Sequence, residues 1–360
     1  MAAGRWQAWW RRWDCRLARR AARWARALGG TRRRACAMTG GSGDCTGSVL
    51  VLTEYLHRRG VPVVWAYRSD PSTVPSWAAG VRAGTARHRW IAARSHWWLT
   101  DGQPMRVSGT DTVGRPLERG RDTVIIAVAE PTVERVGRDI VDWPLLTPRQ
   151  QRALTIRAEI DVDHVLAPSR EWGEAQARAL GYSAPVESAS VLTHLVPDAQ
   201  ASRQHLGVGA DVDIVGVFSS RGEEAAMAAA LEGVDGIVAI DASTAIDRLR
   251  VIGCCSVVVT DSSGWAAVAA CAGRPVIVCA PDLRDLLSRG PGLYVPWQRE
   301  LPGPFVVGRE GLRGAVLALK AAGWRPGSEF AAGRLALASL ADDGRDSHED
   351  DVLAILEGLA

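Results

Sequence analysis

A run of small polar residues in the second half of the sequence is suited to hold a phosphate group. It follows the apolar stretch 256–260, precedes a predicted helix, and consists of Asp261, Ser262, Ser263 and Gly264. Hydroxyl groups and free backbone N–H groups at the start of a helix donate hydrogen bonds to phosphate oxygens. The same residues also suit an ordinary helix cap, so both interpretations stay open.

A second predicted loop offers a positively charged group for the same purpose. The stretch 213–219 ends in Ser219, Ser220 and Arg221, again just before a predicted helix. A guanidinium group donates two parallel hydrogen bonds to a phosphate, which makes Arg221 a candidate ligand. The alternative interpretation is an arginine on an ordinary exposed surface.

Two residues beside the last predicted strand are candidates for nucleotide contacts. Arg274 opens the apolar stretch 275–279, and Asp282 follows it. Asp282 either binds a ribose hydroxyl or caps the helix that we expect from residue 283.

A glycine-rich loop in the first half of the sequence is a candidate for contact with an acceptor. Gly41, Ser42 and Gly43 follow a short predicted strand, and small residues let a substrate approach the backbone closely. A plain turn is the alternative. No G-x-G-x-x-G with a suitably placed acid accompanies the loop, so it is not a dinucleotide-binding fingerprint.

The cysteine and histidine residues predict neither a metal centre nor a disulfide framework. Seven cysteines in 360 residues is ordinary usage, no C-x-x-C pair occurs, and no histidine stands at metal-ligand spacing from them. We therefore expect reduced thiols that mostly fill the core, no metal, no cofactor and a cytoplasmic location.

The candidate loops need strands and helices to position them, and the sequence predicts two α/β halves. Runs rich in Val, Ile and Ala alternate with amphipathic segments, as in parallel sheets covered by helices on both faces. In the first half the expected strands are Ala35–Thr39, Val61–Tyr67, Val81–Gly84, Trp97–Thr100, Thr123–Val128 and Val162–Ala167. In the second half they are Asp213–Ser219, Gly236–Ile240, Ser256–Thr260 and Pro275–Cys279.

The predicted helices complete two doubly wound domains that face each other across a cleft. The helices between strands are Thr46–Arg59, Arg87–Arg94, Glu171–Leu180, Glu223–Leu231, Thr244–Ile252 and Trp265–Ala272. A last helix, His348–Leu359, is expected to fold back across the junction, and the hinge is expected near Val196–Leu206. The expected units are an amphipathic helix at 1–34, domains at 35–200 and 201–340, and a closing helix at 341–360. Ligands of such sheets bind beyond the carboxyl ends of the strands.

The first 34 residues concentrate positive charge that the rest of the chain lacks. They hold eleven Arg and one acid, Asp14, within a chain of net charge +3, so the remainder is mildly acidic. On a helix, Trp and Arg side chains separate onto different sides. These include Trp6, Trp10, Trp13 and Trp24 on the apolar side and Arg12, Arg16 and Arg19 on the basic side. This pattern is typical of a helix that lies on an anionic membrane surface.

Other interpretations of this segment explain its composition less well. A cleaved signal needs an apolar stretch of about 7–15 residues, and this segment has none. Transit peptides are rich in Ser, and this segment contains no Ser. Packing on its own domain and a nucleic-acid arm are the remaining alternatives. No run of about 18 apolar residues is present to predict a spanning helix, so we expect a peripheral membrane protein. We also expect that the protein does not bind nucleic acid.

The stretch 256–304 resembles the signature of the CDP-glycerol glycerophosphotransferases, the family of teichoic-acid primases and polymerases. The family has T-D-Y-S-S after a strand, then a (K/R)-P strand, D-L, R-G-x-Y and P-G-P, in this order. The matching positions are Thr260–Gly264, Arg274-Pro275, Asp282-Leu283, Arg289 with Tyr294, and Pro302-Gly303-Pro304. A weaker resemblance extends over about residues 35–360 and includes the segments IVGVFSSR and DDGRDSHEDDVLAIL.

The resemblance implies a GT-B architecture of two Rossmann-like domains and a transfer of glycerol phosphate from CDP-glycerol. The acceptor would be a lipid-linked compound or a polymer at the cytoplasmic face of the plasma membrane. The donor phosphates are then expected at Ser219, Ser220, Arg221, Asp261, Ser262, Ser263 and Gly264, and the nucleotide at Arg274, Asp282 and Gly303. Gly41, Ser42 and Gly43 would face the acceptor.

The sequence departs from the family at the residues that carry its acid–base chemistry. The motif W-H-G-T-P-L-K-R-I-G falls on VAEPTVERVG, which puts Ala129 where the family has a histidine. The chain between Arg221 and Ile240 is too short for the family's R-x-H-P strand, and Gly264 replaces a serine. Because a general base contributes about 10²–10⁴-fold, Glu130 is the candidate substitute. The histidines that show no acid–base constellation are His57, His88, His96, His164, His194, His205 and His348.

Three functional hypotheses stay open from the sequence. The first is a membrane-associated transferase that moves glycerol phosphate or another polyol phosphate from a CDP donor. The second is a catalytically degenerate relative that binds nucleotide or serves as a scaffold. The third is a GT-B glycosyltransferase that uses a nucleotide sugar, with Glu130 as its base.

Overall fold

The computed structural model describes the two sheets and most of the helices that cover them. The described residues are 24, 32–38, 47–68, 70–100, 106–107, 115–116, 122–129, 139, 147, 162–189, 199–219, 222–241, 248–261, 264–280, 293–295, 297, 299, 301–341 and 349–359. Of the basic leader, Trp24 and Arg32–Arg34 are described: the Trp24 side chain is 65% exposed, and Arg32–Arg34 begin a strand rather than continue a helix. Predictions that lie outside the described residues concern Trp6, Trp10, Trp13, Arg12, Arg16, Arg19, Gly41, Ser42, Gly43, Glu130, Ser220, Arg221, Ser262, Ser263 and Asp282.

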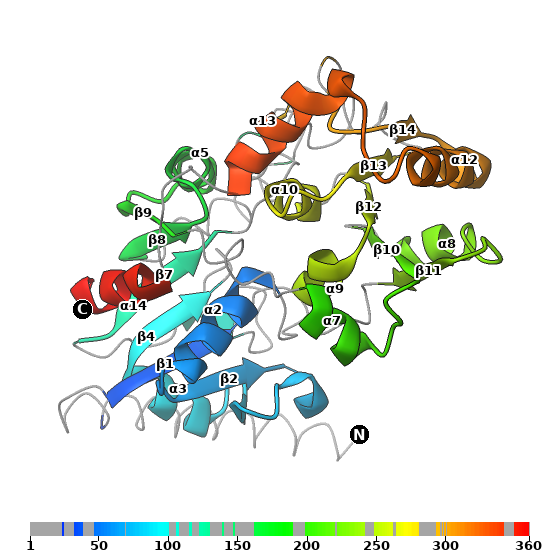
Figure 1. Cartoon of the computed structure of the whole chain (residues 1–360). Coiled ribbons are helices and arrows are strands. Elements are labelled where there is room, and N and C mark those ends of the chain that lie inside the picture. The colour runs from blue at the N-terminus through cyan, green and yellow to red at the C-terminus, as the bar shows by residue number, and fades with distance from the viewer. Residues whose placement is uncertain are drawn as a thin grey trace.

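Seven parallel strands form the first sheet (Figure 1). They are β1 (Arg32–Met38), β2 (Val63–Tyr67), β3 (Ala79–Arg82), β4 (Ser95–Thr100), β7 (Val124–Val128), β8 (His164–Ala167) and β9 (Val186–Ser188). Their order is β3-β2-β1-β4-β7-β8-β9. The chain therefore moves outward from β1 in one direction and then returns to the other side of β1, which puts the point of reversal between β1 and β4.

Both faces of the first sheet are buried, which explains its nearly continuous apolar strands. Successive side chains of a strand point to opposite faces. Trp65 and Leu99 share one buried cluster with Leu52 of helix α2 (Gly47–Arg58), whereas Val64 and Trp98 share another with Ala92 of α3 (Ala86–Ala93).

Five parallel strands form the second sheet, in the order β11-β10-β12-β13-β14. They are β10 (Asp213–Phe218), β11 (Ile237–Asp241), β12 (Val257–Thr260), β13 (Val276–Cys279) and β14 (Phe305–Val306). One face packs on α8 (Glu224–Ala229) and α12 (Gly308–Ala321), and the other packs on α9 (Arg248–Cys254) and α10 (Trp265–Cys271). The point of reversal of this sheet lies between β10 and β12.

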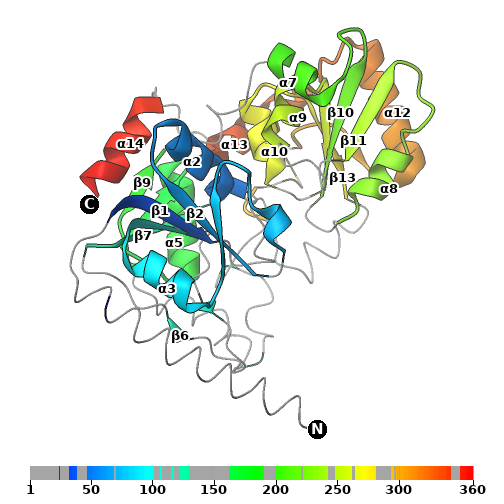
Figure 2. The same cartoon turned by 90° about the horizontal axis from the view of Figure 1, so that it is seen from below.

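The two sheets share one apolar core, to which side chains of the last two helices contribute. Figure 2 shows the last helix beside the first sheet. Helix α13 (Ala331–Ala341) packs against α10 and also contacts α5 (Arg170–Leu180) of the first half. Helix α14 (Glu349–Gly358) returns to the first sheet, where the indole nitrogen of Trp97 donates a hydrogen bond of 3.1 Å to the Leu356 carbonyl. The last predicted helix is thus present as Glu349–Gly358, and it contacts the first sheet.

Side-chain contacts add to the connection between the halves. The Tyr294 ring packs edge-on against Trp172 at 4.8 Å, and its hydroxyl group lies 3.0 Å from the Asp139 carboxylate. In addition, the Cys271 thiol donates to the Ala338 carbonyl at 3.1 Å, which ties α10 to α13.

Local sequence signals explain several helix boundaries. Helix α5 begins after Ser169, whose hydroxyl accepts a hydrogen bond from Trp172 N, and it ends at Gly181 with a φ of 79°. Glycine adopts this left-handed conformation without strain, so Gly181 ends the helix as predicted. Helix α3 begins in the same way at Thr85, whose hydroxyl accepts from His88 N.

Some elements differ from the predictions. Helix α7 (Ala199–Leu206) occupies the segment where we expected a hinge, and it packs against α9 with Ser202 fully buried. Strands β9 and β14 and helices α12 and α13 were not predicted. The remaining short elements are the antiparallel pair β5 (Arg106–Val107) and β6 (Arg115–Pro116) and the 3₁₀ turns η1 (Pro71–Thr73) and η5 (Ser328–Phe330).

The described ranges contain neither a candidate membrane span nor a candidate metal cluster. No helix among these residues is long and apolar enough to cross a bilayer. In the same part of the chain, no three His, Cys, Asp or Glu side chains are grouped so as to hold a metal ion. Burial raises the pKa of the Cys36 and Cys255 thiols to about 12, so neither is a thiolate at neutral pH.

Candidate functional site

The carboxyl edge of the second sheet brings the two predicted phosphate loops together. Phe218, the last residue of β10, pairs with Thr260, the last residue of β12. The chain segments that follow these residues therefore leave the sheet side by side, at the point where the strand order reverses. Ligands of doubly wound sheets bind at such points, because the two connections diverge there and leave a crevice.

A buried polar pair joins the first residues of the two loops. The hydroxyl group of Ser219 donates a hydrogen bond of 2.7 Å to the carboxylate of Asp261, and the two residues are only 7% and 3% exposed. A hydrogen bond to a buried carboxylate is costly to lose, since the charge would remain without its partner. The pair therefore holds the starts of both loops in a fixed relation.

Ser219 also bonds to the two residues at the start of α8. Its hydroxyl oxygen accepts a hydrogen bond of 3.2 Å from Glu223 N, and its own N–H donates to the Glu224 carboxylate at 3.2 Å. These two bonds tie the end of β10 to the start of α8. Because the hydroxyl hydrogen is already donated to Asp261, Ser219 positions the loops, and a direct bond from it to phosphate would require that contact to break.

The remaining phosphate candidates are described only in part. Gly264 lies at the start of α10, with helical backbone angles and no side-chain cap. Ser220, Arg221, Ser262 and Ser263 lie outside the described residues. The described members of the predicted set, Ser219, Asp261 and Gly264, thus lie at one edge of one sheet.

Arg274 and Gly303, predicted as nucleotide contacts, lie at the opposite edge of the sheet. Arg274 precedes β13, and its guanidinium group donates to the Gly253 carbonyl at the end of α9. A strand of four residues spans roughly 13 Å, which separates Arg274 from the Ser219–Asp261 pair. Gly303 lies against the start of β13, where an added Cβ would come within 1.7 Å of the Val276 carbonyl oxygen. Glycine is thus required for packing there, and this contact lets β14 pair with β13.

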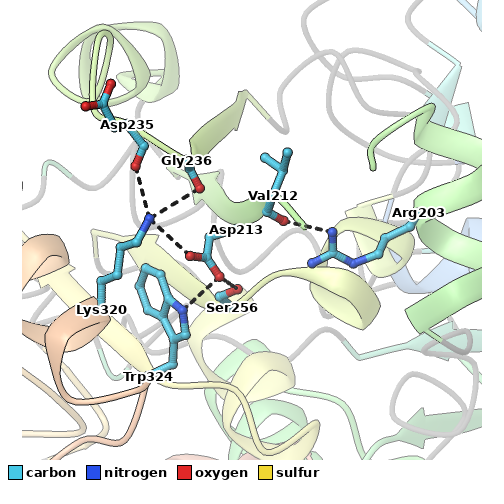
Figure 3. A network of polar contacts seen from close by, with 8 residues as sticks. All are labelled: Arg203, Val212, Asp213, Asp235, Gly236, Ser256, Lys320 and Trp324. Atoms are coloured by element: carbon cyan, nitrogen blue, oxygen red, sulfur yellow. Dashed lines mark hydrogen bonds and ion pairs between the residues drawn. The ribbon is translucent and has the colours of Figure 1, made fainter. Parts of the chain in front are cut away.

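The amino edge of the second sheet carries an extensive polar network (Figure 3). The Asp213 carboxylate accepts hydrogen bonds from the Trp324 indole at 2.9 Å and from the Ser256 hydroxyl at 3.1 Å. Lys320, the only lysine of the chain, lies 3.3 Å from the same carboxylate, and Arg203 donates to the Val212 carbonyl at 2.8 Å. These contacts join the sheet to its flanking helices and leave this edge occupied by the protein's own groups.

The carboxyl edge of the first sheet holds a small pocket. It is lined by Ser48, Leu52, Val128, Ala129, Leu166, Ala167, Pro168 and Ala189. These residues come from the start of α2 and from the ends of β7, β8 and β9. The loop that contains Gly41, Ser42 and Gly43 joins β1 to α2 and lies outside the described residues. Ala129 stands where the family motif has its histidine, so the wall of the pocket offers a methyl group at that place.

Histidines do not supply the missing imidazole in the described part of the chain. The four whose side chains are described, His57, His88, His96 and His164, are not among the residues that line the pocket. Burial, with the nearby charge of Arg89, lowers the pKa of His88 to about 4. His88 is therefore neutral at pH 7, and it accepts a hydrogen bond from Gly84 N at Nδ1.

An aromatic and cationic cluster at the carboxyl edge of the second sheet was not predicted from the sequence. Phe218 and Trp265 stack with ring centroids 5.7 Å apart, and the Arg248 guanidinium lies 5.6 Å from the centre of the Trp265 ring. The only sequence signal was a large aromatic residue directly after the predicted phosphate loop, in an otherwise small-residue helix.

Solved structures of the wall teichoic acid polymerase TagF are similar to this chain over nearly its whole length. A histidine-to-asparagine variant of TagF soaked with CDPG for 15 minutes gives a TM-score of 0.74 at 16% identity, covering 97% of this chain and 93% of that chain. The same variant without CDPG gives 0.71 with 96% and 93% covered, and TagF itself gives 0.67 with 91% and 89% covered, both at 16% identity. No family model and no curated protein sequence matches this chain.

The likeness at 16% identity establishes the fold. The chain has the GT-B architecture of two Rossmann-like sheets, as the resemblance implied, and this prediction is confirmed. TagF is itself a CDP-glycerol glycerophosphotransferase, so these TagF structures belong to the family that the motifs of this chain resemble.

Proposed function

We propose that this protein transfers glycerol phosphate, or a similar polyol phosphate, from a cytidine diphosphate donor to a polymer or a lipid-linked acceptor. The observation that carries the proposal is the Ser219–Asp261 pair at the reversal point of the second sheet. The family-like residues Thr260–Gly264 begin at this point, where doubly wound sheets bind nucleotides.

The proposed reaction is a displacement at phosphorus. A hydroxyl oxygen of the acceptor forms a bond to the β-phosphorus of the donor, and the bond from that phosphorus to the bridging oxygen breaks. Cytidine monophosphate leaves with the electron pair of the broken bond, and the hydroxyl proton passes to a base. Little covalent chemistry falls to the protein, so positioning and charge compensation dominate catalysis.

Glu130 is the proposed base. It follows Ala129, whose backbone N–H donates to the Leu166 carbonyl at 2.7 Å and so fixes the end of β7 at the carboxyl edge. Glu130 is the next residue along the chain from Ala129, which lines the pocket. Its proposed role is tested by Glu130→Gln, which should abolish turnover and leave donor binding unchanged. Unchanged turnover would mean that another residue is the base.

We also propose that the basic leader holds the protein on an anionic membrane surface, where a lipid-linked acceptor is accessible. The support is its sequence, in which eleven Arg and five Trp occur within 34 residues. Deletion of residues 1–30 should release the protein from phosphatidylglycerol vesicles in a flotation assay. Equal binding of the shortened chain would refute this role.

Donor binding is tested most directly by thermal denaturation with nucleotides. Cytidine monophosphate and CDP-glycerol should raise the Tm of the full chain, and the double variant Arg221→Ala/Ser263→Ala should remove the rise. The matched control is Arg59→Ala/Ser339→Ala, which changes an exposed arginine just after α2 and an exposed serine on α13. Absence of any rise with the unaltered chain would refute donor binding.

A nucleotide-binding protein without turnover is the second candidate function. The observation that favours it is the pocket at Ala129, which is lined mainly by apolar side chains where the family has a histidine. An assay for cytidine monophosphate release from CDP-glycerol, with a glycerol phosphate polymer as acceptor, separates the two. Release above the uncatalysed rate supports the transferase, and binding without release supports the second candidate.

A further inference from the structure

The stack of Phe218, Trp265 and Arg248 is built from three separate elements. Phe218 ends β10, Trp265 begins α10, and Arg248 begins α9. Phe218 is 1% exposed and belongs to the shared core, so it gives the Trp265 ring a rigid support. A guanidinium group held over an aromatic ring has fewer positions to sample than one in solvent.

The stack stands at the reversal point of the second sheet. Phe218 and Thr260 are partners in the β10–β12 ladder, and side chains at paired positions of parallel strands point to the same face. This face carries α9 and α10 and belongs to the core shared with the first sheet. Thr260 Oγ1 is fully buried there and has no hydrogen-bond partner in the described part of the chain.

The charges near this point are unfavourable for a phosphate without a cation. Asp261 and Glu224 are buried at the carboxyl edge, and Glu223 lies beside them. The charges of Glu223 and Asp261 act together on Cys279, whose pKa is raised mainly by burial and further by these two carboxylates. A diphosphate placed here would meet negative charge from several sides, so it needs a nearby positive group.

We propose that Arg248 binds the diphosphate of the cytidine donor and that Trp265 holds its guanidinium group in place. The inference rests on the proposed function. It adds to the proposed donor site a second cation, Arg248, which lies outside the motif-like segments. The guanidinium carbon of Arg248 lies 5.6 Å from the centre of the Trp265 ring, and a guanidinium group carries five N–H donors in a planar fork that suits phosphate oxygens. Arg248 thus offsets the carboxylates of this edge, and Trp265 is a positioning residue.

The test compares three probes on the full chain by isothermal titration calorimetry. The probes are cytidine diphosphate, cytidine monophosphate and cytidine, which differ only in their phosphates. Arg248→Met keeps the length of the side chain and removes its charge. It should weaken cytidine diphosphate binding about 10- to 100-fold, weaken monophosphate binding less, and leave cytidine binding unchanged.

Two further variants separate charge from geometry. Arg248→Lys keeps the positive charge and loses the planar fork, so it should recover only part of the diphosphate affinity. Trp265→Phe keeps an aromatic face and should bind nearly as the unaltered chain does, whereas Trp265→Leu should approach Arg248→Met. The control is Arg59→Met: Arg59 is exposed just after α2, its guanidinium lies 5.5 Å from the centre of the Tyr55 ring, and the variant should bind all probes normally.

The possible results lead to distinct conclusions. If the unaltered chain binds none of the probes, the proposed function fails and this inference fails with it. If the unaltered chain binds cytidine diphosphate and Arg248→Met binds it equally well, only the inference fails. An equal loss for all three probes would also overturn it, because Arg248 would then serve the nucleoside or the fold.

Discussion

The carboxyl edges of the two sheets occupy equivalent topological positions but carry different side chains. In the first sheet the described edge is a pocket lined mainly by Leu, Val and Ala, with Ala129 in the place of a family histidine. In the second sheet the edge holds the Ser219–Asp261 pair, a buried Glu224 and the Arg248–Trp265 contact. The fold supplies two sites for ligands, and the polar chemistry is concentrated at one of them.

This difference teaches that the fold and the reacting groups vary independently. The GT-B framework spans nearly the whole chain, while a position suited to a base in the first half carries a methyl group. We therefore expect that donor binding and proton removal, both proposed above, can be altered separately.

Restoring an imidazole at the first edge should have the largest effect. Ala129→His places the ring beside the pocket, whose apolar walls favour its neutral form at pH 7. We expect the rate of cytidine monophosphate release from CDP-glycerol to rise by about 10²-fold or more, since this is the contribution of a general base. Ala189→His, at the β9 side of the same pocket, is the matched control and should give no rise. If both variants remain at the unaltered rate while nucleotide still binds, the first edge is not the acceptor site.

Acid should destabilise the fold through the first half. The pKa of His88 is about 4 in the folded chain because of burial and Arg89, against an ordinary value near 6.5. The neutral ring therefore contributes stability that is fully present above about pH 6.5 and is lost as the pH falls toward 4. The loss amounts to about 3 kcal/mol in the free energy of unfolding.

Urea denaturation at a series of pH values measures this loss. His88→Gln should be less stable at pH 7 and show a flatter dependence on pH, whereas the exposed His57→Gln should follow the unaltered chain. A His88→Gln curve as steep as that of the unaltered chain would assign the acid sensitivity to other groups.

Removing the hydroxyl group at the second edge should have an intermediate effect. Ser219→Ala deprives the buried Asp261 of a hydrogen bond and leaves the Glu223 N–H without its hydroxyl partner, at a cost of about 1–2 kcal/mol in stability. Nucleotide affinity should fall as well, because the two loops lose their fixed relation. Ser339→Ala, at an exposed serine on α13 that donates to the Ala336 carbonyl, should leave both quantities unchanged. Normal nucleotide affinity in Ser219→Ala would show that the Ser219–Asp261 pair is not part of the binding site.

The opposite edge of the same sheet should give the smallest effect. Lys320→Met removes the contacts to Asp213 and to the Asp235 carbonyl, and its side chain is 33% exposed. Such partly exposed pairs contribute about 1 kcal/mol or less, so the Tm should fall slightly and the nucleotide affinity should not change. An affinity loss as large as that of Ser219→Ala would mean that the amino edge takes part in binding.

The strands and the loops that follow them were predictable from the sequence to a large extent. Periodic apolar runs identified β10 and β12, and the residues after them marked the edge where Ser219 and Asp261 meet. The turn residue Gly181 identified the end of α5. These signals are local, since each depends on a few consecutive residues.

Features that depend on distant residues were not predictable. Arg274 and Gly303 belong to motif-like segments, but only the sheet register shows that they lie at the amino edge. The Arg248–Trp265 contact joins residues 17 positions apart in the sequence, and no periodicity indicates it. Helix α13 was not predicted, and its role depends on contacts with α5 and α10, which are distant in the sequence.

The return of α14 to the first sheet has a mechanical consequence. The chain leaves the second half through α13 and reaches the first sheet at the Trp97 indole, so apolar contacts of the described helices hold both lobes together. A wide opening of the lobes would expose this interface to water. The spacing of the two carboxyl edges is thus set largely when the polypeptide folds, and a truncation or bulky tag at the carboxyl terminus would disturb it from afar.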